Sequence, residues 1–362
     1  MKLLLRSLSS IDWLLLLPAA LLFAAGLVTL HSAALGTGYF DRQVAFGIAG
    51  LVIMLIAAAV PWKIWKLLAL PCYLGLLLLL AAVLLFGSEA NNARRWLSFG
   101  SLSVQPSELA KLIVPLAVAC FYSLFDKRRL WQHFVAALLV LVPAALVFVQ
   151  PDLGTALMIG AAGALVIFFA GLPLWFMALA ALIAASVSPY VWNEVLKDYQ
   201  KDRIISITDP YQDPLGAGYH TIQSNIAVGS GGMWGKGWEQ GSQSQLGFLP
   251  ERHTDFIFAV HAEEFGFVGS MLLLAIIMIV FLKMAYMAGA ARDYAGSLTA
   301  AGLCFAFLLQ SLINLGMVSG VLPVVGLPLP MISYGGTSLL TLFATFGVMM
   351  AIGFHRERRA VL

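Results

Sequence analysis

Residues 256–285 read FIFAVHAEEFGFVGSMLLLAIIMIVFLKMA, and from Phe265 onward this stretch is almost wholly apolar. A helix needs about 20 such residues to cross ~30 Å of hydrocarbon, so the stretch predicts a transmembrane helix. The whole chain has the same character, because 61% of its 362 residues are hydrophobic and only 11% are charged. Too little polar surface remains to coat a soluble globule of this size. The sequence therefore indicates an integral membrane protein.

Further apolar stretches of suitable length recur along the chain and predict an all-α fold with ten transmembrane helices. The expected spans are Trp13–Ser32, Gln43–Val60, Leu67–Phe86, Ser107–Phe125, Phe134–Val149, Thr155–Ala170, Leu174–Tyr190, Phe256–Ala285, Ala295–Gly320 and Gly336–Phe354. No repeat and no low-complexity linker divides the chain, so residues 1–362 are expected to form one polytopic membrane domain.

The basic residues predict the orientation, because Lys and Arg favour the cytoplasmic side of short loops. With the amino terminus inside, the inner loops carry most of them, among them Lys63, Lys66, Lys283 and Arg292. The short outer loops carry only Arg42, Arg94 and Arg95. Both termini are therefore expected to be cytoplasmic. The net charge of +3 comes mostly from inner loops and does not indicate nucleic-acid binding.

The segment 191–254 is expected to be a large extracytoplasmic loop between the seventh and eighth spans. It is polar, rich in Gly and Gln, and contains several aromatic residues, which favours a partly ordered loop on the membrane surface. Its glycines could let backbone amides approach an anion, with Lys236 adding charge. A flexible connector is the alternative interpretation of the same residues.

Charge gathers just before the long apolar run, in LPERHTDFIFAV, residues 249–260. At ~1.5 Å per residue, Asp255 would stand roughly 15 Å above the run, at the depth of lipid headgroups. Thr254 is a candidate N-cap, with Asp255 in the first helical turn, and this structural role competes with a catalytic one. Arg252 belongs to the same charged rim. Glu263 would lie about 80° from Asp255 around the helix, near enough to support it.

Three more charged residues lie in or beside predicted spans. Glu108 and Lys111, at i and i+3 in QPSELAKL, share one helical face and should face protein or a wet cavity. A mutual salt bridge or a path for a polar headgroup would each explain this pair. Asp152, in QPDLGTA, suits a helix cap as well as a site.

Read in order, these motifs resemble the SEDS family (shape, elongation, division and sporulation), and within it the RodA-like branch. The matching pieces are NNARRWLSFGSLSVQPSELAKL, QPDLGTA, GSGGMWGKGWEQGSQSQLGFLPERHTDFIFAV, EEFGFVG and GLPLPMISYGG. These pieces are spread from the third span to the tenth, and the resemblance covers nearly the whole chain. The resemblance implies a peptidoglycan glycosyltransferase that polymerises lipid II at the outer face of the cytoplasmic membrane.

The resemblance also implies roles for residues. The family's essential loop acid falls on Asp255 and its sensitive loop Trp on Trp96. An α-linked donor and a β-linked product imply an inverting displacement, in which Asp255 takes the proton of the acceptor hydroxyl. Positive charge would stabilise the departing pyrophosphate. The residues expected to bind the substrate are Trp96, Arg94, Arg95, Glu108, Lys111, Asp152, Lys236, Arg252 and Glu263. Whether a divalent cation screens the pyrophosphate stays open.

The implied partners are lipid II and the growing glycan strand, a class B penicillin-binding protein that supplies transpeptidase activity, and the rod-elongation machinery. A lipid II flippase or other transporter is the main alternative, because ten spans with intramembrane charge and Gly/Pro breaks also suit alternating access. The clustering of acids at the outer surface favours the enzyme. A third interpretation is a scaffold that only anchors a cell-wall partner, for which Asp255 would be dispensable.

Overall fold

The computed structural model describes residues 11–90, 93–99, 102–125, 129–196, 201, 205, 211, 213, 214, 216 and 218–357. Its long helices are α2 (Trp13–Ala33), α3 (Tyr39–Ala59), α4 (Trp62–Phe86), α5 (Pro106–Tyr122), α6 (Leu130–Val149), α7 (Leu153–Phe169), α8 (Leu174–Tyr190), α12 (Ile257–Ala290), α13 (Tyr294–Val318) and α14 (Gly336–Glu357). Each of the ten predicted spans overlaps one of these helices.

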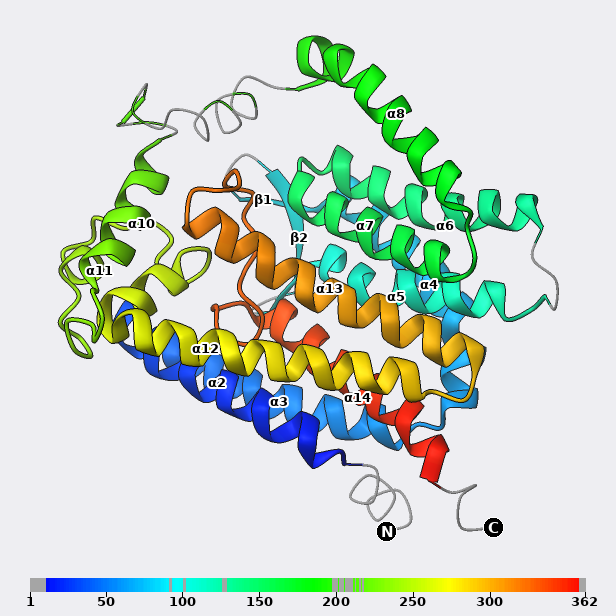
Figure 1. Ribbon diagram of the computed structural model, residues 1–362, viewed down its shortest axis with the longest axis horizontal. Coiled ribbons are helices and arrows are strands. Elements are labelled where there is room, and N and C mark those ends of the chain that lie inside the picture. Colours follow the sequence, from blue (N-terminus) through cyan, green and yellow to red (C-terminus); the bar gives the residue numbers. More distant parts are fainter. Residues whose placement is uncertain are drawn as a thin grey trace.

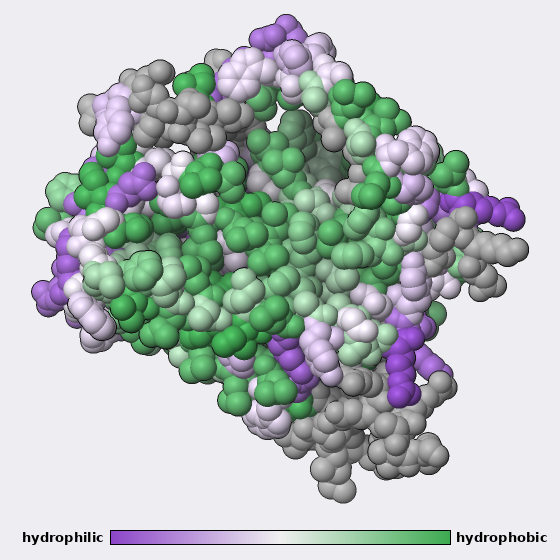
Figure 2. Space-filling model, in the orientation of Figure 1, coloured by the Kyte–Doolittle hydropathy of each residue, from purple (hydrophilic) through white to green (hydrophobic). Residues whose placement is uncertain are grey.

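Seven described helices are long and apolar enough to cross a membrane: α2, α3, α4, α6, α12, α13 and the first part of α14. Apolar side chains cover most of the face shown in Figure 2, as expected of a surface that contacts lipid. The chain is thus a multi-pass membrane protein. That α5, α7 and α8 also cross stays a prediction. In Figure 1, α8 stands away from the rest of the bundle.

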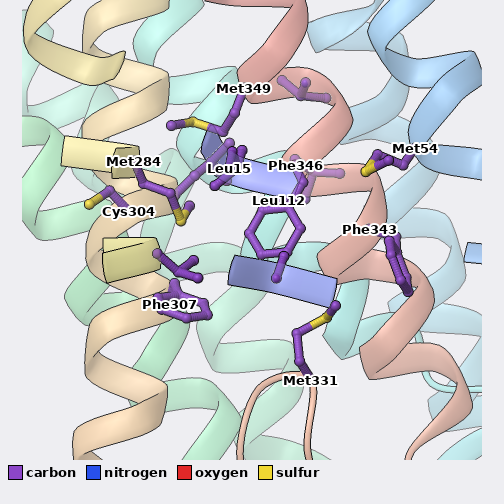
Figure 3. Packing of buried hydrophobic residues seen from close by; sticks show 14 of the residues in the cluster. Leu15, Met54, Leu112, Met284, Cys304, Phe307, Met331, Phe343, Phe346 and Met349 are labelled. Atoms are coloured by element: carbon purple, nitrogen blue, oxygen red, sulfur yellow. The ribbon is translucent and has the colours of Figure 1, made fainter. Parts of the chain in front are cut away.

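The core lies around α14, which packs along α3 and also touches α5 and α12. Phe343, Phe346 and Met349 of α14 point into one cluster with Leu15 of α2 and Leu112 of α5 (Figure 3). Several cluster members are methionines, whose flexible side chains fill irregular gaps between helices. This packing makes the helices on either side of α14 one body and fixes the loops at their ends.

A small antiparallel sheet follows α4, and the all-α prediction is wrong on this point. Strands β1 (Ser88–Ala90), β2 (Ala93–Phe99) and β3 (Leu102–Val104) pair in that order, with Ser88 opposite Trp96 and Leu97 opposite Val104. The strands are too short and too polar to stand out beside the apolar spans. Hydrogen bonding between neighbouring strands, which sequence periodicity does not show, satisfies their backbone.

The two ends of the bundle differ. At one end, called here the terminal end, Asp12 before α2 pairs with Lys283 of α12 at 2.7 Å, and Asp293 before α13 bonds Trp62 and Lys66 of α4. The described chain begins and ends there (Figure 1). At the opposite end, called the site end, α12 begins and α13 ends. The predicted inner basic residues Lys63, Lys66, Lys283 and Arg292 all belong to the terminal end.

Among its described residues, the predicted outer loop contains a π-helix, η1 (Val191–Val195), and the short helices α10 (Tyr219–Ser230) and α11 (Ser242–Gln245). α10 packs on α12, and its Ser224 donates a hydrogen bond to the carbonyl of Val318 at 2.7 Å. The part of this segment from α10 onward is thus built onto the site end of the bundle (Figure 1).

α12 is broken at Gly266, where φ is 67° and ψ is −162°, a conformation essentially restricted to glycine. The break releases helical carbonyls and amides, and the loop 232–237 binds them. Lys236 N donates to Glu263 O and Gly237 N to Glu264 O, both at 3.0 Å, while Phe267 N donates to Gly232 O at 2.8 Å. The glycines of this loop permit this close backbone pairing, because a Cβ on Gly235 would lie 2.1 Å from the carbonyl oxygen of Glu264.

Candidate active site

Asp255 lies in a tight turn before α12. Thr254 N and Phe256 N both donate to the carbonyl of Glu251, at 3.1 and 3.3 Å, and close this turn. Buried Leu249 and Phe256 anchor it in an apolar cluster. The predicted N-cap at Thr254 is wrong, because α12 begins at Ile257 and its cap residue is Phe256, with no side-chain cap. The local hydrogen bonds and the buried Phe256 outweigh the capping preference of threonine.

Two other segments hold the backbone around Asp255. Asn314 of α13 donates from Nδ2 to the carbonyls of Asp255 and Leu327, at 2.9 and 2.8 Å. Ser333 Oγ donates to Thr254 O at 2.6 Å, and Tyr334 N donates to His253 O at 2.9 Å. These bonds join the Asp255 turn to the loop 319–335 between α13 and α14. The acid is therefore placed by tertiary contacts rather than by the helix that follows it.

The Asp255 carboxylate faces Gly326, since a Cβ built on Gly326 would lie 3.6 Å from Asp255 Oδ2. Gly326 has φ 74°, which favours glycine there. On the α7 side, a Cβ on Gly154 would lie 2.8 Å from the carbonyl oxygen of Val325. The same stretch of loop therefore lies beside Asp255 and beside the start of α7, where Asp152 is found.

Asp152 is buried and serves both as a helix cap and as part of a polar cluster. Its Oδ1 accepts Thr155 N at 3.3 Å, and its Oδ2 accepts Gln105 Nε2 at 3.1 Å. Arg95 Nη1 lies 3.9 Å from Asp152 Oδ1, and another Arg95 nitrogen donates to the carbonyl of Pro151. The Arg95 side chain remains 31% exposed. Arg95 is thus a site-end cation that has both a specific anchor and access to solvent.

Arg94 and Trp96 are the neighbours of Arg95 on β2. Trp96 is half-buried and pairs with Ser88 of β1, whose hydroxyl donates to its carbonyl at 3.2 Å. The Arg94 side chain lies outside the described residues. Next to the sheet, the hydroxyl of Thr337 on α14 accepts Gln105 N at 3.3 Å, so the sheet is tied to the start of α14.

Glu108 and Lys111 form the predicted salt bridge, with Lys111 Nζ 2.7 Å from Glu108 Oε2. Both are buried, and Lys111 also donates to Gln310 Oε1 at 2.9 Å. Gln310 Nε2 in turn donates to Pro328 O at 2.7 Å, in the loop that faces Asp255. A cavity of about 40 Å³ lies beside the pair, lined also by Ser338 and Thr341. This network supports the loop from within the bundle.

Lys236 and Glu263 bind each other, with Lys236 Nζ 2.7 Å from Glu263 Oε1. Glu263 also accepts the backbone amides of Gln243 and Ser244, at 2.9 and 3.3 Å. The predicted placement of Glu263 beside Asp255 on one helix is wrong, because Asp255 precedes the helix. These contacts make the pair a clamp on the loop 236–244. They favour a structural role over direct binding of substrate.

Arg252 and His253 flank the acid on its N-terminal side. Arg252 Nη1 donates to the carbonyl of Ser244. The His253 ring stacks on Tyr39 with centroids 4.7 Å apart, and burial lowers the pKa of His253 although nearby Glu251 raises it. A hollow of about 300 Å³ lies beside them, lined also by Thr37, Tyr39 and Gly247.

The structure thus brings Asp255, Asp152 and Arg95 around one loop, with Glu108 and Lys111 beneath it. Asp255 is a partly exposed carboxylate, which suits proton abstraction, and Arg95 supplies positive charge at the same end of the bundle. Among the described residues, no group of three or more His, Cys, Asp or Glu is arranged to hold a metal ion. Sequence reasoning missed Asn314, Gln105, Gln310 and Ser333, although a polar side chain inside an apolar span, such as Asn314, was a visible signal.

Comparisons with known proteins agree with one another. Residues 12–358 match the model of a family described as cell cycle protein, FtsW/RodA/SpoVE. The chain is 43% identical over 345 residues to peptidoglycan glycosyltransferase MrdB of Escherichia coli K12, covering 95% of this chain and 93% of that protein. A chain from a peptidoglycan synthase complex that coordinates polymerization and crosslinking superposes with a TM-score of 0.82 and 35% identity, covering 96% and 98% of the two chains. The crystal structure of Thermus thermophilus rod shape determining protein RodA matches with a TM-score of 0.74 and 32% identity, covering 96% and 97%.

Proposed function

The chain belongs to the FtsW/RodA/SpoVE family of cell cycle proteins, and from that premise we propose how it works as a peptidoglycan glycosyltransferase. Asp255 is the general base of an inverting glycosyl transfer in which lipid II is polymerised during cell elongation. The observation that carries this proposal is the placement of Asp255, whose backbone is held by Asn314 and whose carboxylate faces Gly326 at the site end.

The reaction needs few protein groups. A carboxylate oxygen of Asp255 takes the proton of the acceptor sugar hydroxyl, while the oxygen of that hydroxyl attacks the anomeric carbon of the donor. The bond between the anomeric carbon and the phosphate oxygen breaks, its electron pair stays on that oxygen, and the lipid pyrophosphate leaves. Since the leaving group is already activated, no second carboxylate is needed to protonate it, unlike in a glycoside hydrolase.

Arg95 is the cation best placed to meet the pyrophosphate. It is partly exposed, its 3.9 Å separation from Asp152 is long for an ion pair, and its hydrogen bond to the carbonyl of Pro151 leaves further guanidinium N–H groups to meet an anionic ligand. Lys111, Lys236 and Arg252 are already engaged by Glu108, Glu263 and Ser244. We propose that Arg94 and Trp96 of β2 also contribute to substrate binding.

We place the site on the extracytoplasmic side of the cytoplasmic membrane, with both termini in the cytoplasm. The basic residues of the terminal end support this orientation, since they favour the cytoplasmic side. A class B penicillin-binding protein would supply crosslinking, a pairing supported by the likeness to a chain of a complex that coordinates polymerization and crosslinking. The likeness to a rod shape determining protein supports a role in elongation.

A lipid II flippase and a scaffold remain the rival functions. The decisive experiment measures glycan polymerisation from lipid II by the purified protein with its penicillin-binding partner, for wild type, Asp255→Ala and Asp255→Asn. Thermal unfolding confirms first that all three fold equally. We expect polymer from wild type alone, with a loss of at least about a hundredfold in each variant.

Each other outcome has a meaning. Polymer from all three proteins would remove Asp255 from the chemistry. No polymer from any of them, together with lipid II crossing liposomes that contain the protein, would identify a flippase. Neither activity from wild type, with intact binding of the partner, would favour the scaffold.

A further inference from the structure

The clamp between Lys236 and Glu263 includes more hydrogen bonds than the single ion pair of the two side chains. Glu263 is a fully buried carboxylate, and four donors converge on it. Its Oε1 accepts Lys236 Nζ, Gln243 N and Ser242 Oγ, at 2.7, 2.9 and 3.3 Å, and its Oε2 accepts Ser244 N at 3.3 Å. A buried charge is retained only when its surroundings satisfy it in this way, so the geometry of the loop 242–244 is closely defined.

A continuous set of contacts leads from this clamp to Asp255. Ser244 donates its amide to Glu263 and accepts Arg252 Nη1 on its carbonyl. Arg252 stands in the turn that Glu251 O closes by accepting Thr254 N and Phe256 N. Asn314 and Ser333 hold the other side of the turn. The turn that carries Asp255 is thus held between the loop 319–335 and the loop 236–244.

We propose that Glu263 is a positioning residue for Asp255. Its carboxylate sets the loop 236–244, and Ser244 and Arg252 transmit that setting to the turn that presents the base. The inference rests on the proposed role of Asp255 as the base. Displacing a catalytic group by about 1 Å costs up to about a hundredfold in rate, so a remote anchor of this kind affects turnover without touching substrate.

Glu263→Gln is a selective test of this relay. Glutamine keeps the volume and one acceptor oxygen, which serves the three donors on Oε1, but it places an NH₂ group opposite Ser244 N, where two donors repel. The exchange therefore removes the hydrogen bond from Ser244 N to Glu263, the contact that connects Glu263 with Arg252 through Ser244. Arg252→Met breaks the next step while keeping much of the aliphatic side chain.

The experiment uses the full-length protein with its penicillin-binding partner and measures kcat, the KM for lipid II and the pH dependence of kcat. We expect Glu263→Gln and Arg252→Met each to lower kcat about ten- to a hundredfold, with KM within about twofold. The double variant should be no slower than the slower single one, because both act through one path. The loss of kcat should become smaller as the pH rises, because hydroxide can then take the proton in place of the misplaced Asp255 carboxylate.

Lys66→Met is the matched control, since it removes a Lys–Asp ion pair of 3.1 Å at the terminal end and should leave kcat unchanged. Three results would overturn the inference: wild-type kcat in Glu263→Gln, a loss that only tracks the folded fraction with an unchanged pH profile, or a fully additive double variant. A rise in KM for Arg252→Met would instead assign Arg252 to substrate binding. Full activity of Asp255→Asn would show that Asp255 is not the base. This result does not depend on the Glu263 variants, so it separates failure of the proposed function from failure of the inference about Glu263.

Discussion

Asn314 is the residue on which the placement of Asp255 depends most directly. It is fully buried inside α13, and its amide group spans the carbonyls of Asp255 and Leu327. Each carbonyl would lose its partner if the amide were removed, at a cost of about 1–3 kcal/mol for a buried group. A single side chain therefore couples the stability of the site end to the position of the base.

Asn314→Leu should accordingly lower the free energy of unfolding by about 2 kcal/mol or more and reduce polymerisation at least about tenfold. The measurement is thermal unfolding in detergent alongside lipid II turnover. Ser311→Ala, one turn away and also buried, loses only a hydroxyl that donates to Phe307 O within the helix, so it should change both quantities far less. Equal effects of the two substitutions would contradict this account of Asn314.

His253 predicts a pH dependence of stability. Burial against Tyr39 lowers the pKa of His253 below its ordinary value of about 6.5. Below that value the unfolded chain binds the proton more readily than the folded one, so the folded state loses stability as pH falls from about 7.5 to about 5.5. His253→Phe keeps a ring against Tyr39 and should show a smaller fall in unfolding temperature over this range. A fall as large as that of wild type would exclude His253 as the cause.

For the structure of the site end, the break in α12 is more important than the length of this helix. A straight helix would bond its own carbonyls at 263 and 264, whereas the kink at Gly266 offers them to the loop 232–237. Helix and loop therefore form one interlocked unit, in which Gly235 and Gly266 approach so closely that a Cβ on Gly266 would lie 2.2 Å from Gly235 N. The clamp on Glu263 depends on this unit.

Gly266→Ala should therefore destabilise the protein by about 1–3 kcal/mol or more, because alanine cannot adopt the glycine-only conformation and its Cβ would collide with backbone. Limited proteolysis should show earlier cleavage in the loop 232–247. Gly289→Ala, in the same helix and with no atom within 4 Å of the added Cβ, should be neutral or slightly stabilising. If both variants unfolded alike, the interlock would not be a source of stability.

Along the bundle axis, the basic residues of the short loops lie at one end and Asp255 lies at the other. Lys63, Lys66, Lys283 and Arg292 belong to the terminal end with the described chain ends, and Asp255 lies beside the loop 319–335 at the site end. Apolar side chains cover most of the face shown in Figure 2. This arrangement supports the proposed orientation, with the site on the extracytoplasmic side.

Cysteine labelling in intact cells tests the orientation. Glu251 at the site end and Lys63 at the terminal end are both exposed. A membrane-impermeant thiol reagent should label Glu251→Cys in intact cells and Lys63→Cys only after lysis. The parent chain, whose Cys72, Cys120 and Cys304 are at least partly buried in helices, controls for background. The reverse pattern would invert the proposed topology.

The amino-acid sequence was enough to predict the membrane character, the approximate position of every long helix and the family, and it offered the salt bridge of Glu108 with Lys111 as one of two interpretations. These features depend on residues that are close together in the sequence, such as long apolar runs, i,i+3 pairs and short motifs, and they can therefore be recognised in the sequence alone. Only the tertiary structure decided that β1–β3 form a sheet, that Asp255 stands outside α12, and that Glu263 clamps a loop. The sheet depends on pairing between neighbouring strands, which periodicity does not reveal. The other two features depend on hydrogen bonds between residues farther apart in the chain, such as Asn314 with Asp255 and Ser244 with Glu263, and these partners meet only when the bundle closes.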